Sequence, residues 1–183
     1  MLSALSLKNR ALAKLSKIAD FQTRKMIASG LIMSSLSYLI QVYGGCSGYL
    51  LNMLQVQQNV AARLTTKLPW FTSTGELLKQ CGWLSVRQLI QYHSLILFHK
   101  VLKEKKPTYL YDHIKVRVRE TRTTDEHTLQ EDRRFKTVTA SKSFIPRTLK
   151  DWNKLPFELR AIEAPRLFKT GLNRYLIDNT PVK

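Results

Sequence analysis

Few residues in this sequence have the type and spacing needed for catalytic or metal chemistry. The four histidines are His93, His99, His113 and His127, and the first two lie six positions apart, on different faces of a predicted helix. No Cys-x-x-Cys, zinc-knuckle or His-Glu-x-x-His spacing occurs, and Cys46 has no neighbouring base to activate its thiol. We therefore expect no catalytic residue, no metal site, no cofactor and no small-molecule substrate. The helical histidines should be hydrogen-bonded core residues.

Positive charge is the strongest chemical feature of the chain. Its 183 residues include 30 Lys and Arg but only 13 Asp and Glu, for a net charge of +17, and no carboxylate occurs between Asp20 and Glu76. An excess of this size favours polyanionic partners, with nucleic acid first and an anionic membrane surface second. Apolar residues make up 44% of the chain, too many for a disordered polycation, so most of its length should fold.

Two groups of side chains are candidates for contacts with phosphates. The first group lies in the acid-free stretch and comprises Arg24, Lys25, Gln55, Asn59, Arg63 and Lys67. Its last four members form a row spaced by four residues. The second lies in a loop of dense mixed charge: Arg117, Arg119, Arg122, Arg133 and Arg134. Such side chains contact phosphate and sugar and position a duplex without reading its sequence. A solvated charged face is the alternative for both groups.

Helices must position the first group. An opening amphipathic helix is predicted by the spacing of its apolar residues, Leu5, Leu12, Leu15 and Ile18. Its outward lysines are Lys8, Lys14 and Lys17. A second helix should run from an N-cap at Asp20 to Tyr43, and it should be central because its apolar residues surround the axis. The glycines of "GGCSG" at 44–48 then break it.

A third helix should begin at an N-cap at Ser47 and stop at Pro69. One apolar stripe, stepping by three and four, predicts its buried face: Leu50, Leu54, Gln57, Ala61, Leu64 and Leu68. Two capping boxes of the Ser-x-x-Glu/Gln type follow. The box at Ser73 opens a short helix that ends at Gly82, and the box at Ser85 opens the longest and most buried helix.

Together these elements predict a mainly α fold in three parts. Residues 1–110 form a helical bundle, residues 111–143 a basic loop or linker with at most a short strand pair, and residues 144–183 a C-terminal helical extension. Pro165 suits the first turn of the last helix, because proline there loses no hydrogen bond that the helix would make.

The uncharged stretch from Met26 to Tyr43 raises the question of a membrane span. At 18 residues it is nearly long enough to cross a bilayer, but several serines dilute it. We therefore expect a buried helix and no membrane insertion. The two cysteines and the interrupted apolar character of the first residues favour a nuclear or cytoplasmic location.

Six strings occur in one order along the chain. They are "YLIQVYGG", "LNMLQVQQNVAARL", "GELLKQCGWLSVRQLIQYHSLILFHKVL", "PTYLYDHI", "SKSFIPRTLKDWNKLP" and "RLFKTGLNRYLI". The series resembles the region that follows the catalytic palm in reverse transcriptases of non-LTR (LINE-type) retrotransposons, with Tyr43 in place of a family tryptophan. In that family this region includes the thumb, which holds the primer–template duplex.

The resemblance implies a thumb-like bundle that binds RNA or an RNA–DNA duplex through its backbone. Within its thumb-like part lie Arg24, Lys25, Asn59, Arg63 and Lys67. The family's Tyr/Phe-x-Asp-Asp metal-binding turn is absent, so we expect a non-catalytic remnant of an RNA-directed DNA polymerase. Structural anchors are expected at Trp83, Trp152 and Pro156, with Trp152 filling an apolar pocket and Pro156 ending a helix. The alternative is a structural or protein-interaction helical module with no nucleic-acid role.

Overall fold

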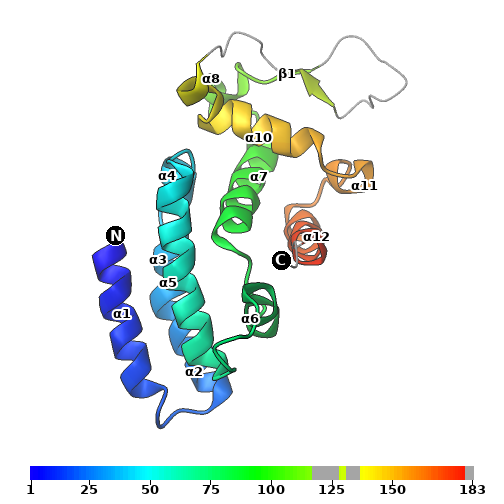
Figure 1. Ribbon diagram of the computed structural model, residues 1–183. Helices are drawn as coiled ribbons and strands as arrows, with labels where there is room; N and C mark the ends of the chain where they lie inside the picture. Colours follow the sequence, from blue (N-terminus) through cyan, green and yellow to red (C-terminus); the bar gives the residue numbers. More distant parts are fainter. Residues whose placement is uncertain (117–127, 131–136, 180–183) are drawn as a thin grey trace. The chain divides into compact units, whose positions relative to one another are not determined.

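The computed structural model of the chain describes residues 1–116, 128–130 and 137–179 (Figure 1). This part of the chain is mainly α-helical, which confirms the fold class expected from the sequence. The elements, in chain order, are α1 (Leu2–Leu15), α2 (Phe21–Ala28), η1 (Ser29–Met33), α3 (Ser34–Ser37), α4 (Ile40–Tyr43), α5 (Gly48–Thr66), α6 (Thr74–Cys81), α7 (Val86–Glu104), α8 (Thr108–Tyr111), β1 (Lys115–Val116), β2 (Leu129–Gln130), α9 (Val138–Ser141), α10 (Phe144–Asn153), α11 (Phe157–Arg160) and α12 (Pro165–Asp178).

The chain divides into two compact units. Unit 1 comprises Met1–Ile40, Cys46–Ile90 and Leu176–Lys183, and unit 2 comprises Gln41–Gly45 and Gln91–Tyr175. The division passes through α7 and α12. The boundaries expected from the sequence near residues 110 and 143 stay a prediction.

In unit 1, α1, the α2–η1–α3 helix and α5 lie side by side (Figure 1). Helix α1 buries Leu5, Asn9 and Leu12. The Asn9 Nδ2 donates to the main-chain oxygen of Gln57 on α5 at 3.1 Å, so a polar residue joins the two helices. Ile18, placed on the predicted apolar face, is exposed because α1 ends before it.

The second helix begins at its expected cap but ends earlier than expected. The Asp20 carboxylate accepts from Thr23 N at 3.2 Å, and the helix continues through the π-helical turn η1 to α3. It breaks at Tyr38, and Leu39 then has a φ of 50°. Met26 is exposed, so this helix is not buried all round. In the part of the chain that the structure describes, no helix combines the length and apolar character that crossing a bilayer requires.

The buried face of α5 differs from the predicted stripe. Its buried residues are Leu51, Leu54, Gln58, Ala61, Ala62 and Thr65. Gln58 is accommodated because its Nε2 donates to Leu84 O at 2.8 Å, and Thr65 because its hydroxyl donates to Ala61 O at 2.8 Å. Leu50, an expected core residue, is exposed instead. Hydrogen bonds to buried polar side chains thus rotate the buried face away from the apolar pattern.

Both predicted helix starts form, with an N-cap hydrogen bond at Ser73 and a complete capping box at Ser85. Ser73 Oγ accepts from Glu76 N at 3.3 Å, and α6 ends at Gly82 in the left-handed region with a φ of 66°. Ser85 N donates to Gln88 Oε1 at 3.0 Å, and Gln88 N donates back to Ser85 Oγ at 3.4 Å. Local side-chain signals therefore set both helix starts.

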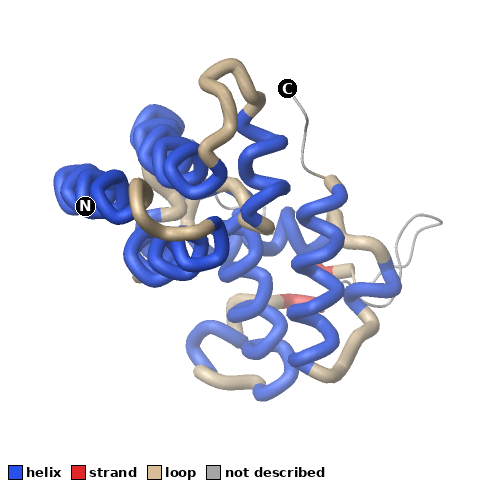
Figure 2. Tube along the Cα trace, turned by 90° about the horizontal axis from the view of Figure 1, so that it is seen from below, coloured by secondary structure: helices blue, strands red, loops and turns tan. Residues whose placement is uncertain are grey.

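Unit 2 contains a cluster of buried aromatic rings from α7, α10 and α12. The ring of Trp152 lies 5.6 Å from that of Phe98 and 5.8 Å from that of Phe168, between centroids. Strands β1 and β2 form one antiparallel pair, drawn in red in Figure 2, in agreement with the expected short strand pair. Helix α12 begins at Pro165, as predicted.

Candidate functional site

Arg24, a predicted phosphate contact, is buried within unit 1. Its Nε donates to Thr65 O at 2.8 Å and its Nη1 donates to Ala19 O at 2.6 Å. Thr65 lies in the last turn of α5, and Ala19 lies in the turn between α1 and α2, so one guanidinium joins three helix ends. Because these donors are committed to main-chain oxygens, we assign Arg24 a structural role and leave it out of the candidate interface.

The row spaced by four on α5 is turned toward neighbouring segments of unit 1. Gln55 Oε1 accepts from Val86 N at 2.8 Å, and this hydrogen bond caps the start of α7. Asn59 Nδ2 donates to Thr74 Oγ1 at 3.3 Å at the start of α6. A further hydrogen bond of 2.8 Å joins Gln55 Nε2 to Asn59 Oδ1. These two amides therefore hold helices together, and both side chains are half-buried.

Arg63, the next member of that row, holds the turn that follows α5. Its Nη1 donates to Pro69 O at 3.2 Å and its Nη2 donates to Thr72 O at 3.2 Å. Lys67, the last member, closes α5 with a φ of 56° and has an exposed side chain. The predicted row thus exists on one side of α5, but it offers one exposed cation to a ligand instead of four polar side chains.

Four lysines lie at or beside the helix ends that Arg24 joins, and we call them the basic end: Lys14 in the last turn of α1, Lys17 just after α1, Lys25 next to Arg24 in α2, and Lys67 at the end of α5. Lys25 is half-buried, and the other three are exposed. Lys17 and Lys67 each lie two residues from a carbonyl that Arg24 binds. Lys25 Nζ lies 3.7 Å from the position that a Cβ on Gly82 would take. Figure 1 shows α1 and α5 ending, and α2 beginning, at this same end of the bundle.

Among the described residues, no lysine of the basic end forms an ion pair with a carboxylate. Both ion pairs found among residues 1–116, 128–130 and 137–179 lie in unit 2, where Lys100 meets Glu104 at 3.9 Å and Lys103 meets Glu163 at 2.9 Å. Asp20, whose carboxylate caps α2 at this same end, is the one acid among residues 1–75. Four lysines against one carboxylate leave a positive surface potential at the basic end.

The outer face of α1 adds one cation that the sequence analysis did not select. Arg10 is exposed, one turn before Lys14 and opposite the buried face of the helix. Lys8, which was expected to point outward, is half-buried and donates to Ser35 Oγ. The spacing of Arg10, Lys14 and Lys17 by four and three was the sequence signal for this row.

The second predicted group comprises Arg117, Arg119, Arg122, Arg133 and Arg134, and it lies outside the described residues. The candidate interface is therefore built from unit 1, out of the basic end and Arg10.

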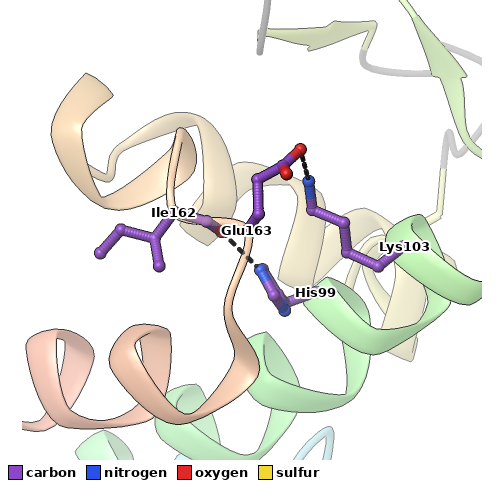
Figure 3. A network of polar contacts seen from close by, with 4 residues as sticks. All are labelled: His99, Lys103, Ile162 and Glu163. Carbon is purple, nitrogen blue, oxygen red and sulfur yellow. Dashed lines mark hydrogen bonds and ion pairs between the residues drawn. The ribbon is translucent and has the colours of Figure 1, made fainter.

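His99 is the core histidine that the sequence predicted. Its Nε2 donates to Ile162 O at 2.8 Å (Figure 3), and its ring stacks on Phe168 with centroids 4.2 Å apart. Burial lowers the pKa of His99 and the charge of Lys103 lowers it further, although the hydrogen bond to Ile162 opposes both effects. Lys103 in turn forms an ion pair with Glu163 beside the His99 ring (Figure 3). His99 is therefore an uncharged packing residue at neutral pH.

In the part of the chain that the structure describes, the buried Cys81 thiol is not activated as a nucleophile and no cluster of metal ligands forms. Burial raises the pKa of the Cys81 thiol to about 11, although the Lys25 ammonium opposes the shift, so this thiol is protonated at neutral pH. Burial also raises the pKa of Asp151, against the charges of Lys154 and Arg147. Within those ranges, no three side chains of His, Cys, Asp or Glu come together as metal ligands.

The Trp-Asn-x-Leu-Pro string joins α10 to the strand pair and to α11. Trp152 and Leu155 are buried in unit 2. Asn153 Nδ2 donates to Leu129 O, and Leu129 N donates to Asn153 Oδ1, each at 3.0 Å. Helix α10 ends at Asn153, and Pro156 stands at the N-cap of α11. Sequence reasoning selected the tryptophan and the proline but assigned no role to the asparagine between them.

Trp83, the remaining predicted anchor, packs half-buried against a core cluster of unit 1. That cluster consists of Ala62, Leu77, Leu78 and Cys81. The main-chain N of Trp83 donates to Leu78 O at 2.9 Å, just past the glycine that ends α6. Trp83 thus helps to seat α6 against α5.

Comparisons with known proteins leave the family open. No protein-family model, no curated protein and no solved structure matches the chain. The resemblance to LINE-type reverse transcriptases therefore stays a prediction from the sequence strings. Function has to be argued from the residues that unit 1 exposes.

Proposed function

We propose that the chain binds the sugar–phosphate backbone of a nucleic-acid duplex, an RNA or RNA–DNA duplex, without reading sequence and without catalysis. The observation that carries this proposal is the basic end, where Lys14, Lys17, Lys25 and Lys67 gather around three helix ends with no ion pair among the described residues. The resemblance to a reverse-transcriptase thumb supports the same function, and under it the chain is a non-catalytic remnant of such a polymerase.

The chemistry of the basic end suits phosphate contacts. Lysine presents a compact ammonium on a flexible stem, which reaches a phosphate oxygen without requiring one fixed geometry. Contacts of this kind set the position of a duplex and carry no sequence information. Arg10 extends the cations by one turn along α1, about 5.4 Å. Arg24 itself makes no phosphate contact on this proposal, because its donors are committed to Thr65 O and Ala19 O.

A structural or protein-interaction module is the second candidate. The lysines of the basic end lie near the carboxyl ends of α1, α5 and α6, where a positive charge interacts favourably with the helix dipole. On this account they stabilise unit 1 and bind no polyanion. Tyr49, Val56 and Val60, exposed on one side of α5, would then be the surface that meets a protein partner.

A salt titration tests the proposed function directly. Fluorescence anisotropy of a labelled RNA–DNA hybrid is measured with the full chain at several salt concentrations. If about four phosphates are neutralised, the affinity should fall about 150-fold between about 50 and 200 mM salt. An affinity that does not change with salt would exclude binding through the phosphate backbone.

Paired variants test whether the basic end carries the binding. Lys14→Gln with Lys17→Gln should lower the slope of log affinity against log salt by about 1.8. Arg166→Gln with Lys169→Gln removes the same charge from exposed positions of α12 in unit 2 and should leave the slope unchanged. Equal effects of the two double variants would show that net charge alone drives binding and would remove the basic end from the proposal.

A loss of stability without a loss of affinity would favour the second candidate. If the lysines act only on the helix dipoles, each Lys→Gln change should cost about 0.3–1 kcal/mol of unfolding free energy. Urea unfolding of Lys14→Gln with Lys17→Gln measures this term separately from the anisotropy titration.

A further inference from the structure

Two aromatic side chains stand in solvent at the turn that follows α5. Trp70 is 85% exposed and Phe71 is 73% exposed, and their rings meet edge to face with centroids 6.1 Å apart. Burying a large aromatic side chain stabilises a fold, and neither of these two neighbouring rings is buried in unit 1. Folding therefore does not account for aromatic residues at both positions.

The turn that presents these rings is held in place. Thr72 N donates to Pro69 O at 3.1 Å, which places Trp70 and Phe71 at the two central positions of the turn. The guanidinium of Arg63 spans the turn, since it donates to Pro69 O and to Thr72 O at 3.2 Å each. The rings are thus carried by a backbone that is fixed at both ends, which lowers the entropy lost when a ligand binds.

The surroundings of the turn are positively charged. Lys67 is exposed three residues before Trp70, at the basic end, and the sequence holds no carboxylate between Asp20 and Glu76. Open aromatic faces beside cations are the combination that binds unpaired nucleotides, because bases stack on the rings while phosphates meet the charges. A duplex keeps its base faces inside its own stack, so a nucleic-acid ligand of these rings has to offer unpaired bases.

We propose that the turn from Pro69 to Thr72 is a stacking platform for unpaired bases, on which Trp70 and Phe71 bind a single-stranded stretch continuing from a duplex held at the basic end. The ring of Trp70 stacks on a base, and Lys67 binds a phosphate of the same strand. The position of the duplex rests on the proposed function, and the platform adds single-stranded nucleic acid as a second ligand. An anionic membrane surface is the competing occupant of a turn with this composition.

The test compares three labelled probes on the full chain: a blunt RNA–DNA hybrid, the same hybrid with an unpaired extension of about eight nucleotides, and the extension alone. Trp70→Ala should weaken binding of the extended hybrid and of the single strand by about 5- to 150-fold, and should leave the blunt hybrid unchanged. Trp70→Phe should keep most of the affinity because it keeps a ring. Tyr49→Ala is the matched control, since Tyr49 is 72% exposed on α5 and should have no effect.

Each outcome separates this inference from the proposed function. If Trp70→Ala binds the extended hybrid as the unaltered chain does, the platform is refuted while duplex binding stands. If the blunt hybrid does not bind but the single strand binds in a Trp70-dependent way, the proposed function fails and the platform is supported. If Trp70 is needed only for binding to phosphatidylserine vesicles, the turn is a membrane contact and the inference is overturned.

Discussion

The side-chain amide of Asn153 pairs with the main chain of Leu129 in both directions, each hydrogen bond measuring 3.0 Å. Leu129 is buried, so its main-chain N–H and C=O need partners inside the protein. One asparagine at the end of α10 satisfies both groups and thereby attaches β2 to the helix. Within the Trp-Asn-x-Leu-Pro string, the asparagine thus has a role as definite as the packing of Trp152.

Removing this amide should destabilise unit 2. Asn153→Ala leaves two buried main-chain groups without their partner, and we expect a loss of about 2–3 kcal/mol of unfolding free energy in urea. Asn153→Asp keeps the acceptor but sets a carboxylate oxygen against Leu129 O, so it should be similarly unstable at neutral pH. Asn173→Ala, at an exposed position of α12, is the control and should cost less than about 0.5 kcal/mol. A loss below that value for Asn153→Ala would contradict the pairing.

The buried His99 should make stability depend on pH. Burial and Lys103 lower its pKa from the ordinary value of 6.5, so below that value the folded state binds fewer protons than the unfolded state. Stability is therefore lost as the pH falls through about 6.5. We expect the unfolding free energy in urea to be lower at about pH 5.5 than at about pH 7.5, and His99→Phe should reduce this difference.

His93 sets a limit to that pH experiment. Burial also lowers the pKa of His93, so part of the pH dependence should survive in His99→Phe. At neutral pH, His99→Phe should itself cost about 1–2 kcal/mol, because Ile162 O loses its donor while the stacking on Phe168 is kept. A pH dependence that is identical with and without His99 would refute the assignment.

Helix starts were readable from the sequence because their signals are local. Asp20, Ser47 and Ser73 each accept a hydrogen bond from the main-chain N–H three residues further along. Residue type and local sequence position are enough to predict such a cap. The aromatic core position of Trp152 likewise needs only a large apolar side chain on a helical face. Such features depend little on how distant segments pack.

The buried face of α5 and the direction of its polar row were not readable, because both depend on distant partners. Gln58 is fully buried through a hydrogen bond to Leu84, 26 residues away, and hydropathy alone marks a glutamine as exposed. Gln55 and Arg24 look like phosphate contacts by residue type, but their partners Val86 and Thr65 lie 31 and 41 residues away. Whether a cationic side chain can bind a ligand depends on whether nearby main-chain oxygens already accept its hydrogen bonds, and the sequence does not show this.

Arg24 should therefore affect stability and not binding. Arg24→Met keeps most of the side-chain volume but leaves Ala19 O and Thr65 O without their donor, which should cost about 2–4 kcal/mol of unfolding free energy. Under conditions where the variant stays folded, its affinity for the RNA–DNA hybrid should stay within about twofold of the unaltered chain. Urea unfolding and anisotropy of the same sample measure the two effects.

Lys17→Gln should show the opposite behaviour. Lys17 is exposed, so its replacement should change the unfolding free energy by less than about 0.5 kcal/mol while lowering the salt slope of binding by about 0.9. If Arg24→Met weakened binding more than Lys17→Gln did, the guanidinium would have to reach the ligand, and its assignment as a buried tie between helix ends would be wrong.

Gly45 and Gly30 should respond in opposite directions to the same substitution. A Cβ on Gly45 would lie 2.8 Å from Lys142 O, a main-chain atom, so Gly45→Ala should force the two segments of unit 2 apart and cost about 1–3 kcal/mol. A Cβ on Gly30, in the helical stretch η1, would meet nothing within 4 Å, and Gly30→Ala should stabilise unit 1 by about 0.5–1 kcal/mol because the unfolded chain loses freedom. Urea unfolding of the two variants measures both values, and a stabilising Gly45→Ala would show that the chain does not approach Lys142 this closely.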